Sequence, residues 1–216
     1  MFPSLRAALG DLTSRDLAVY ASIMPPSFID GSLALRRDAE LAGQVADPRW
    51  LGRLFSDHSV RERIGADALL AVSERLSIVR IRTLIRQHGL DEARHAEIFT
   101  ALARFFPPVE LDADRSAAIT ALEAETTSAL AREPFSFHEF LTDTHVSEVD
   151  SLHHLTALKA ALAQTNATSR ILLALDTLIG DERFHVFYTA RLLVMAYGAG
   201  SVSKPYIAKS VSNFYG

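Results

Sequence analysis

Two short segments of this chain pair a glutamate with a histidine three residues further on. Residues 91–95 read DEARH and residues 181–185 read DERFH, so both copies have the form D-E-x-x-H. On a helix, residues three apart lie on the same face, so each copy would present a carboxylate and an imidazole together. Two such faces opposed in a helical bundle predict a carboxylate-bridged site for two metal ions. The four predicted ligands from these motifs are Glu92, His95, Glu182 and His185.

A four-helix site of this kind needs one further carboxylate from each of the two remaining helices. Before the second motif, the candidates are Glu139 and Glu148. Glu148 and Glu182 lie at equal sequence distances on either side of a turn near residue 165. Because a helix rises by a constant amount per residue, these two glutamates would lie level in adjacent antiparallel helices. The pattern therefore favours Glu148 over Glu139.

Before the first motif, the candidate carboxylates are Glu62, Asp67 and Glu74. Glu62 and Glu92 lie at equal sequence distances on either side of a turn near Ser77, so this pair is level too. Glu74 lies beside that turn, far from the level of Glu92, so the pattern favours Glu62. If a connecting helix crosses the full bundle, the two turns lie at opposite ends of it. The levels of the two motifs then coincide, because helices of about 30 residues measure ~45 Å and each motif lies about half that length from its own turn.

The elements that must position these residues are helices. Apolar residues recur at helical spacing, strand-like alternation is nearly absent, and prolines separate the segments. The predicted helices are near 13–23, 31–45, 48–75, 78–106, 113–132, 135–163 and 168–196. We therefore predict an all-α bundle in a single domain spanning 1–216. Its core bundle covers about 48–196, with N-terminal helices in 1–47 and a weakly patterned C-terminal tail in 197–216.

Each candidate carboxylate interrupts an apolar or small-residue stripe at helical spacing. A charge in such a place is costly unless it is paired or bound to metal. The stripes around Glu62 and Glu92 include Gly65 and Gly89, and we expect these small residues to leave space for oxygen or a substrate. His145, on the stripe of Glu148, is expected beside the site or on the surface.

Composition excludes several classes of function. The chain has no Cys, which excludes disulfides, thiolate catalysis and metal sites built on sulfur. Its net charge of −4 and the absence of a basic run give no support to nucleic-acid binding. No uncharged stretch reaches the ~18–20 residues that a membrane span needs. The N-terminus lacks the features of a signal peptide, so we expect a soluble protein of the cytoplasm.

Over roughly residues 48–196 the chain resembles the ferritin-like diiron carboxylate superfamily. The resemblance rests on Glu62, Glu92, His95, Glu148, Glu182 and His185. It implies a ferritin-like four-helix bundle with a long crossover connection, to which the N-terminal helices would be additions. Asp91 and Arg94 make the first motif similar to the D-E-x-R-H form of bacterial diiron monooxygenases and acyl-carrier desaturases. By that likeness Asp91 and Asp181 would orient the ligand histidines, a support that histidine ligands generally require. The second motif departs from the form, with Phe184 in place of the arginine.

His88 lies four residues before Glu92, so three ligand side chains share one helical stripe. The p-aminobenzoate N-oxygenases are similar in having an extra histidine four residues before an E-x-x-H glutamate. In that family the histidine belongs to the second motif, where this chain has Leu178. His88 is thus either an additional metal ligand or a buried histidine held by hydrogen bonds.

Carboxylate and imidazole ligands without sulfur suit iron or manganese. We expect two Fe ions, with Mn or a mixed Mn/Fe pair as the alternatives. The superfamily resemblance implies activation of O2 and oxidation of a small organic substrate at nitrogen or carbon, with electrons from a separate donor. The alternatives are oxidation of an acyl chain or fatty aldehyde, ferritin-like iron storage with ferroxidase activity, and a scaffold with a vestigial site. The expected partners are O2, a small molecule, an electron donor and, in a homodimer, a second copy of the chain.

Overall fold

The computed structural model folds the chain into α-helices, and every regular element among the described residues is helical. The described residues are 1–32, 41, 43–108, 113–131, 134–165, 167–200 and 202–215. The predicted all-α class is therefore confirmed. The chain divides into two compact units, one of residues Gln44–Phe135 and the other of Met1–Gly43 with Ser136–Gly216. The prediction of one domain over 1–216 stays a prediction.

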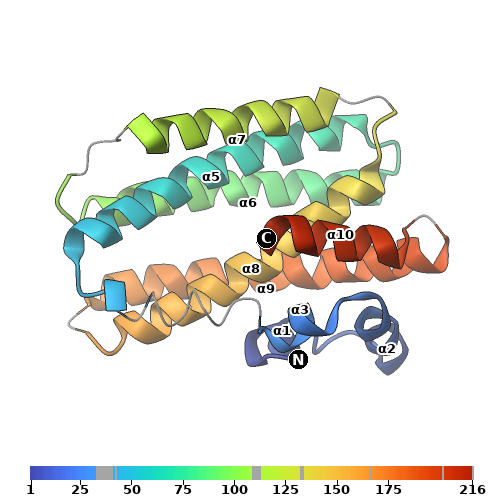
Figure 1. Cartoon of the computed structure of the whole chain (residues 1–216), viewed down its shortest axis with the longest axis horizontal. Helices are drawn as coiled ribbons and strands as arrows, with labels where there is room; N and C mark the ends of the chain where they lie inside the picture. The colour runs from blue at the N-terminus through green and yellow to red at the C-terminus, as the bar shows by residue number, and fades with distance from the viewer. Residues whose placement is uncertain are drawn as a thin grey trace. The chain divides into compact units, whose positions relative to one another are not determined.

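The unit Gln44–Phe135 is built on an antiparallel pair of long helices, α5 (Pro48–Arg75) and α6 (Val79–Ala103), which lie side by side in Figure 1. The side chain of Asp47 accepts a hydrogen bond from the backbone N–H of Arg49 at 2.8 Å, and Pro48 occupies the first turn. Both features are favourable at a helix start, because the first N–H groups have no partner within the helix. A tight turn after Arg75 then reverses the chain.

The third helix of this unit, α7 (Ala113–Ala131), lies along α5 for its whole length (Figure 1). Near its start, Arg115 donates to Asp57 near the start of α5, with Nε at 3.1 Å from Oδ1. Near its end, the carbonyl of Leu130 accepts from Arg75 Nη1 at 2.6 Å. These two contacts show that α7 runs parallel to α5. Helix α7 therefore lies along α5 from Asp57 to Arg75, and the prediction that the connector crosses the full bundle stays a prediction.

The other unit contains a second antiparallel pair, α8 (Phe137–Leu162) and α9 (Ser169–Gly198). Ser136 caps α8 by accepting a hydrogen bond at Oγ from the backbone N–H of Glu139 at 3.3 Å. The helices pack through fully buried leucines, among them Leu152, Leu155 and Leu175. Burying a side chain of this size stabilises the fold by about 1.5–3 kcal/mol.

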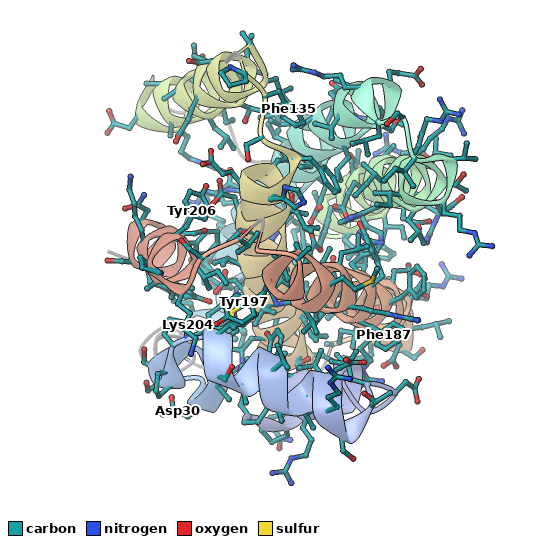
Figure 2. All side chains as sticks on the ribbon, turned by 90° about the vertical axis from the view of Figure 1, so that its right-hand side faces the viewer. Asp30, Phe135, Phe187, Tyr197, Lys204 and Tyr206 are labelled. Carbon is teal, nitrogen blue, oxygen red and sulfur yellow. The ribbon has the colours of Figure 1, made fainter. Side chains whose placement is uncertain are left out.

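Shorter helices complete this second unit: α1 (Pro3–Ala8), α2 (Ser14–Ile23), α3 (Pro26–Asp30) and α10 (Lys204–Tyr215). Helix α1 packs on α8 and α9, α2 packs on α9, and α10 packs on α8. Two hydroxyl groups attach α10 to Asp143 of α8. Ser210 Oγ donates to Oδ1 at 2.6 Å, and the Tyr206 hydroxyl, which points from α10 toward α8 in Figure 2, donates to Oδ2 at 3.4 Å.

The long predicted helices agree with the structure to within three residues at each end. The helix predicted near 31–45 falls largely on residues outside the described ranges. Three helices were not predicted, namely α1, α3 and α10. Helices α1 and α3 are too short to show a helical period, and α10 buries only Ile207, Ser210 and Val211. No described helix has the length and apolar character that crossing a membrane requires.

Candidate metal centre

The α5–α6 hairpin brings together three of the predicted ligands. Glu62 on α5 and Glu92 and His95 on α6 each place one ligand atom within 4.8 Å of the other two, and this group could hold a metal ion. His95 Nδ1 lies 3.7 Å from Glu92 Oε1. Glu92 is 5% exposed and His95 is fully buried, whereas Glu62 is half-buried. Glu62 and Glu92 therefore lie level in the two helices, as their equal sequence distances from the turn predict.

His88 lies beside this group and is almost fully buried. Its Nε2 is 3.1 Å from Glu92 Oε1, which is the distance of a hydrogen bond. The structure thus supports the interpretation of a buried histidine that contacts a ligand carboxylate. Its role as an additional metal ligand stays a prediction.

Polar contacts of the first motif include two within α6 itself. Asp91 Oδ1 accepts from Gln87 Nε2 at 3.2 Å and from Arg94 Nη2 at 3.1 Å. Both of these residues lie one turn from Asp91 on the same helix. The predicted role of Asp91 in orienting His95 stays a prediction, as does the corresponding role of Asp181, which is half-buried on α9.

A hydroxyl group also joins α5 to α6 one turn from the ligands. Ser59 Oγ donates to the backbone carbonyl of Ala96 at 2.9 Å and lies 2.7 Å from Thr100 Oγ1. Ser59 precedes Glu62 by three residues, and Ala96 follows His95 directly. This contact fixes the height of one helix relative to the other at the level of the carboxylates.

The α8–α9 hairpin brings together the equivalent three residues. His185 Nδ1 lies 3.5 Å from Glu148 Oε2 and 3.7 Å from Glu182 Oε2. Glu148 is 8% exposed, Glu182 is 1% exposed and His185 is fully buried. Each hairpin therefore carries the same ligand triad, with one glutamate from its first helix and an E-x-x-H pair from its second. We call the two triads the α5–α6 half-site and the α8–α9 half-site.

A buried histidine that is not a predicted ligand supports the α8–α9 half-site. His145 Nε2 lies 2.8 Å from the hydroxyl of Tyr20, and its Nδ1 lies 2.8 Å from Thr189 Oγ1. Burial lowers the pKa of His145 to about 3, against the smaller opposing effect of the negative charge of Glu148. Burial also raises the pKa of Tyr20 above its ordinary value. Both side chains are therefore neutral at neutral pH.

Sequence reasoning identified His145 only as a residue near the site or on the surface. It placed Thr189 on the stripe of Glu182 without a role, and it missed Tyr20. Thr189 follows His185 by four residues, so it lies on the ligand face of α9, and that spacing was an available signal. Tyr20 belongs to a helix far away in sequence, and nothing in its local pattern indicates a partner on α8.

The expectation that Gly89 leaves space for a substrate is wrong. A Cβ atom at this position would lie 3.0 Å from Leu70 Cγ and 3.2 Å from the carbonyl oxygen of Ala66. Gly89 instead allows α5 and α6 to approach closely near Glu92. At Gly65 an added Cβ would meet no atom within 4 Å, so that position is open.

The structure places the three rejected carboxylate candidates in other surroundings. Glu74 lines a groove with Arg82 and Arg86. Asp67 lines a second groove, of about 660 Å³, between α5, α6 and α7. Glu139 is exposed in the first turn of α8. These positions agree with the sequence preference for Glu62 and Glu148.

The residues of the half-sites fit the chemistry of a divalent cation. Each triad has two carboxylate groups and one imidazole, all of them hard or intermediate donors without sulfur, as iron and manganese prefer. Ionised carboxylates in a buried position are costly unless a cation or hydrogen bonds compensate their charge. One divalent cation would balance the two carboxylates of a triad. The number and identity of the ions stay predictions.

Comparison of the chain with family models, with curated proteins and with solved structures finds no match. The side chains of the two half-sites are therefore the basis from which we infer function.

Proposed function

We propose that this protein is a non-heme diiron oxygenase with a ferritin-like four-helix bundle. Two iron ions would be held by six ligands, which are Glu62, Glu92, His95, Glu148, Glu182 and His185. The observation that carries the proposal is the repetition of one triad, a glutamate plus E-x-x-H, in two separate helical hairpins, with every member buried except the half-buried Glu62. Dimetal carboxylate proteins use this arrangement of four glutamates and two histidines.

The resemblance to the diiron carboxylate superfamily, and not the number of ligands, supports a joint centre over two isolated ones. A single triad supplies three side chains, and iron sites with three protein ligands and open positions also exist. Carboxylates that bridge two ions supply further bonds to each, which a triad alone cannot do. Four carboxylates also balance the four positive charges of two divalent ions, so the complete centre is close to neutral.

A pair of ferrous ions supplies two electrons for the reduction of O2, and the protein supplies position and a dry environment. Burial of Glu92, Glu182 and both ligand histidines excludes bulk water from the ligand atoms. Neighbouring small and apolar residues favour a small organic substrate, oxidised at nitrogen or carbon, with electrons from a separate donor protein. Fatty acyl or aldehyde oxidation is the alternative substrate class for the same centre.

The proposal is tested by anaerobic reconstitution with Fe(II), followed by metal analysis, measurement of the particle mass and measurement of O2 consumption. We expect about two Fe per chain, a monomer or dimer, and O2 consumption that depends on iron and a reductant. Glu74→Ala is the control, because Glu74 lies on α5 beside the turn, far along the helix from Glu62, and its loss should leave the iron content unchanged. A chain without iron would contradict the proposal. A 24-subunit particle that accumulates iron would instead establish storage.

A further inference from the structure

We infer that Tyr20, His145 and Thr189 form one directional hydrogen-bond chain that positions Glu148 and His185 for metal binding. The inference rests on the proposed function of the α8–α9 half-site. It assigns a role to a buried tyrosine and a buried histidine that the six predicted ligands leave unexplained. It also assigns a role to α2, which lies outside the predicted four-helix core.

The direction of the chain follows from its inner end. Thr189 Oγ1 lies 2.6 Å from the backbone carbonyl of His185 and 3.2 Å from that of Val186. A carbonyl oxygen can only accept, so the single hydroxyl proton of Thr189 points into its own helix. The lone pairs of Oγ1 therefore face His145 Nδ1, 2.8 Å away, which must carry a proton to donate.

The protonation of His145 then determines its other contact. Because burial keeps this imidazole neutral, it carries one ring proton, and Nδ1 holds it. Nε2 is consequently an acceptor, and the Tyr20 hydroxyl at 2.8 Å donates to it. The chain runs from Tyr20 through His145 and Thr189 to the carbonyl of His185. Both ring nitrogens of His145 are occupied, so this histidine is a positioning residue, since a metal ligand would need a free nitrogen lone pair.

The chain joins three helices one turn away from the ligand atoms. His145 precedes Glu148 by three residues on α8, and Thr189 follows His185 by four residues on α9. The hydrogen bond between His145 and Thr189 therefore fixes the height of α8 relative to α9 close to the point where Glu148 Oε2 and His185 Nδ1 lie 3.5 Å apart. Tyr20 holds the outer side of the imidazole from α2. A shift of the two helices along each other would separate the two ligand atoms.

The test compares Co(II) binding by the full-length wild-type protein with binding by the Tyr20→Phe and Thr189→Val variants. Binding is measured through the visible absorption of the bound ion. Each variant removes one hydroxyl and keeps the size of the side chain. We expect each to weaken binding at the more affected metal position by about tenfold or more, the usual effect of losing a partner behind a metal ligand. We expect the double variant to bind Co(II) as tightly as the single variant with the lower affinity, because both substitutions break the same hydrogen-bond chain.

Two matched substitutions serve as controls. Thr142→Val removes a buried hydroxyl on α8 that bonds within its own helix, to the carbonyl of His138 at 2.8 Å. Tyr197→Phe removes a tyrosine hydroxyl on α9 (Figure 2). Both controls should bind Co(II) with wild-type affinity. A loss in Thr142→Val equal to that in Thr189→Val, or independent and additive losses in the double variant, would overturn the inference.

A measurement on the wild-type protein keeps the inference testable if a variant fails to fold. The ¹⁵N chemical shifts of His145 should show a proton on Nδ1 and none on Nε2 at pH 7, with the resonances assigned through His145→Gln. A proton on Nε2 would overturn the chain. A wild-type protein that binds no Co(II) or Fe(II) would contradict the proposed function as well. Normal metal binding in all variants would contradict this inference alone.

Discussion

The α5–α6 and α8–α9 half-sites share a ligand triad but differ in what holds it. In the first, Glu92 is contacted by His88 from one turn earlier on the same helix, at 3.1 Å. In the second, Leu178 occupies the position equivalent to His88, and a hydrogen-bond chain from Tyr20 on α2 through His145 on α8 to Thr189 on α9 lies beside the ligands. The first half-site thus has a ligand carboxylate that is contacted from within its own helix, whereas the second has a hydrogen-bond chain that extends to a third helix. The two half-sites should respond differently to substitution.

The largest expected effect tests whether the half-sites form one centre at all. Glu92→Ala and Glu182→Ala should each reduce the iron content from about two ions per chain to none, because bridging carboxylates serve both ions. Far-UV circular dichroism should show unchanged helix content, and the metal-free variants should be at least as stable as the wild type, since a buried charge is removed. Retention of one ion in each variant would indicate two independent sites. Full iron content in both would make the ligand assignment wrong.

Acid should destabilise the protein through His145 of the α8–α9 hairpin. The pKa of His145 is about 3 in the folded protein, against about 6.5 in an unfolded chain. At a pH above the pKa of the unfolded chain, His145 is neutral in both the folded and the unfolded state, and its protonation does not affect the free energy of unfolding. Between these two values the unfolded state binds the proton and the folded state does not. The free energy of unfolding should therefore fall by about 1.4 kcal/mol for each pH unit below about 6.5.

Urea unfolding of the metal-free protein at pH 7, 6 and 5 measures this effect. His145→Gln should lose this part of the pH dependence, whatever its stability at pH 7. His138→Gln, in the first turn of the same helix, is the control and should keep it. An identical pH dependence in the wild type and in His145→Gln would show that His145 is not held neutral by the fold.

Glycine substitutions distinguish the two hairpins by their packing. Gly89→Ala should lower the free energy of unfolding by about 1–3 kcal/mol, because the new methyl group would press on Leu70 and on the backbone of Ala66. Gly180→Ala on α9 meets no atom within 4 Å and should raise it by about 0.5–1 kcal/mol through helix propensity. Thermal and urea unfolding of the two variants provide the comparison. A stabilising Gly89→Ala would contradict the close approach of α5 and α6.

A further expected effect concerns the residue that distinguishes the two motifs. His88→Leu makes the first motif resemble the second, and it should weaken metal binding by about tenfold, whether His88 orients Glu92 or binds the ion itself. Leu178→His makes the reverse change and should leave affinity unaltered unless a fourth side chain can reach the ion. Metal titration with visible absorption measures both, and a change in the spectrum of His88→Leu would identify the histidine as a ligand. Unchanged affinity in His88→Leu would show that the asymmetry has no consequence for metal binding.

The sequence predicts those parts of this protein that depend only on helix geometry. Because rise and turn per residue are constant, the spacings Glu62 to Glu92 and Glu148 to Glu182 relate each glutamate to its partner without knowledge of any tertiary contact. The same geometry requires a connector that crosses the full bundle, which stays a prediction. The ligand roles themselves stay predictions, because they depend on ions and on how carboxylates from both hairpins share them.

The remaining features depend on contacts that a pattern does not encode. A glycine in a stripe is compatible with an open space or with close packing, and only the neighbouring side chains distinguish Gly65 from Gly89. The contact of Tyr20 with His145 joins residues 125 positions apart. Helix α10 packs on α8, which lies far before it in the sequence. Each of these omissions has the same physical cause, a dependence on partners distant in sequence.

The location of each triad within one hairpin has a consequence for the order of folding. A single turn between two helices separates Glu62 from Glu92, and another separates Glu148 from Glu182, so both triads form by closing short loops. The two loops are nearly equal in length, and their closure entropies differ by only about 0.1 kcal/mol, because the cost grows with the logarithm of loop length. Across proteins, contacts between residues closer in sequence go with faster folding, because less loop-closure entropy is lost before they form. The chain can therefore assemble both sets of ligands before any ion arrives, and metal capture becomes a late step made by preformed halves.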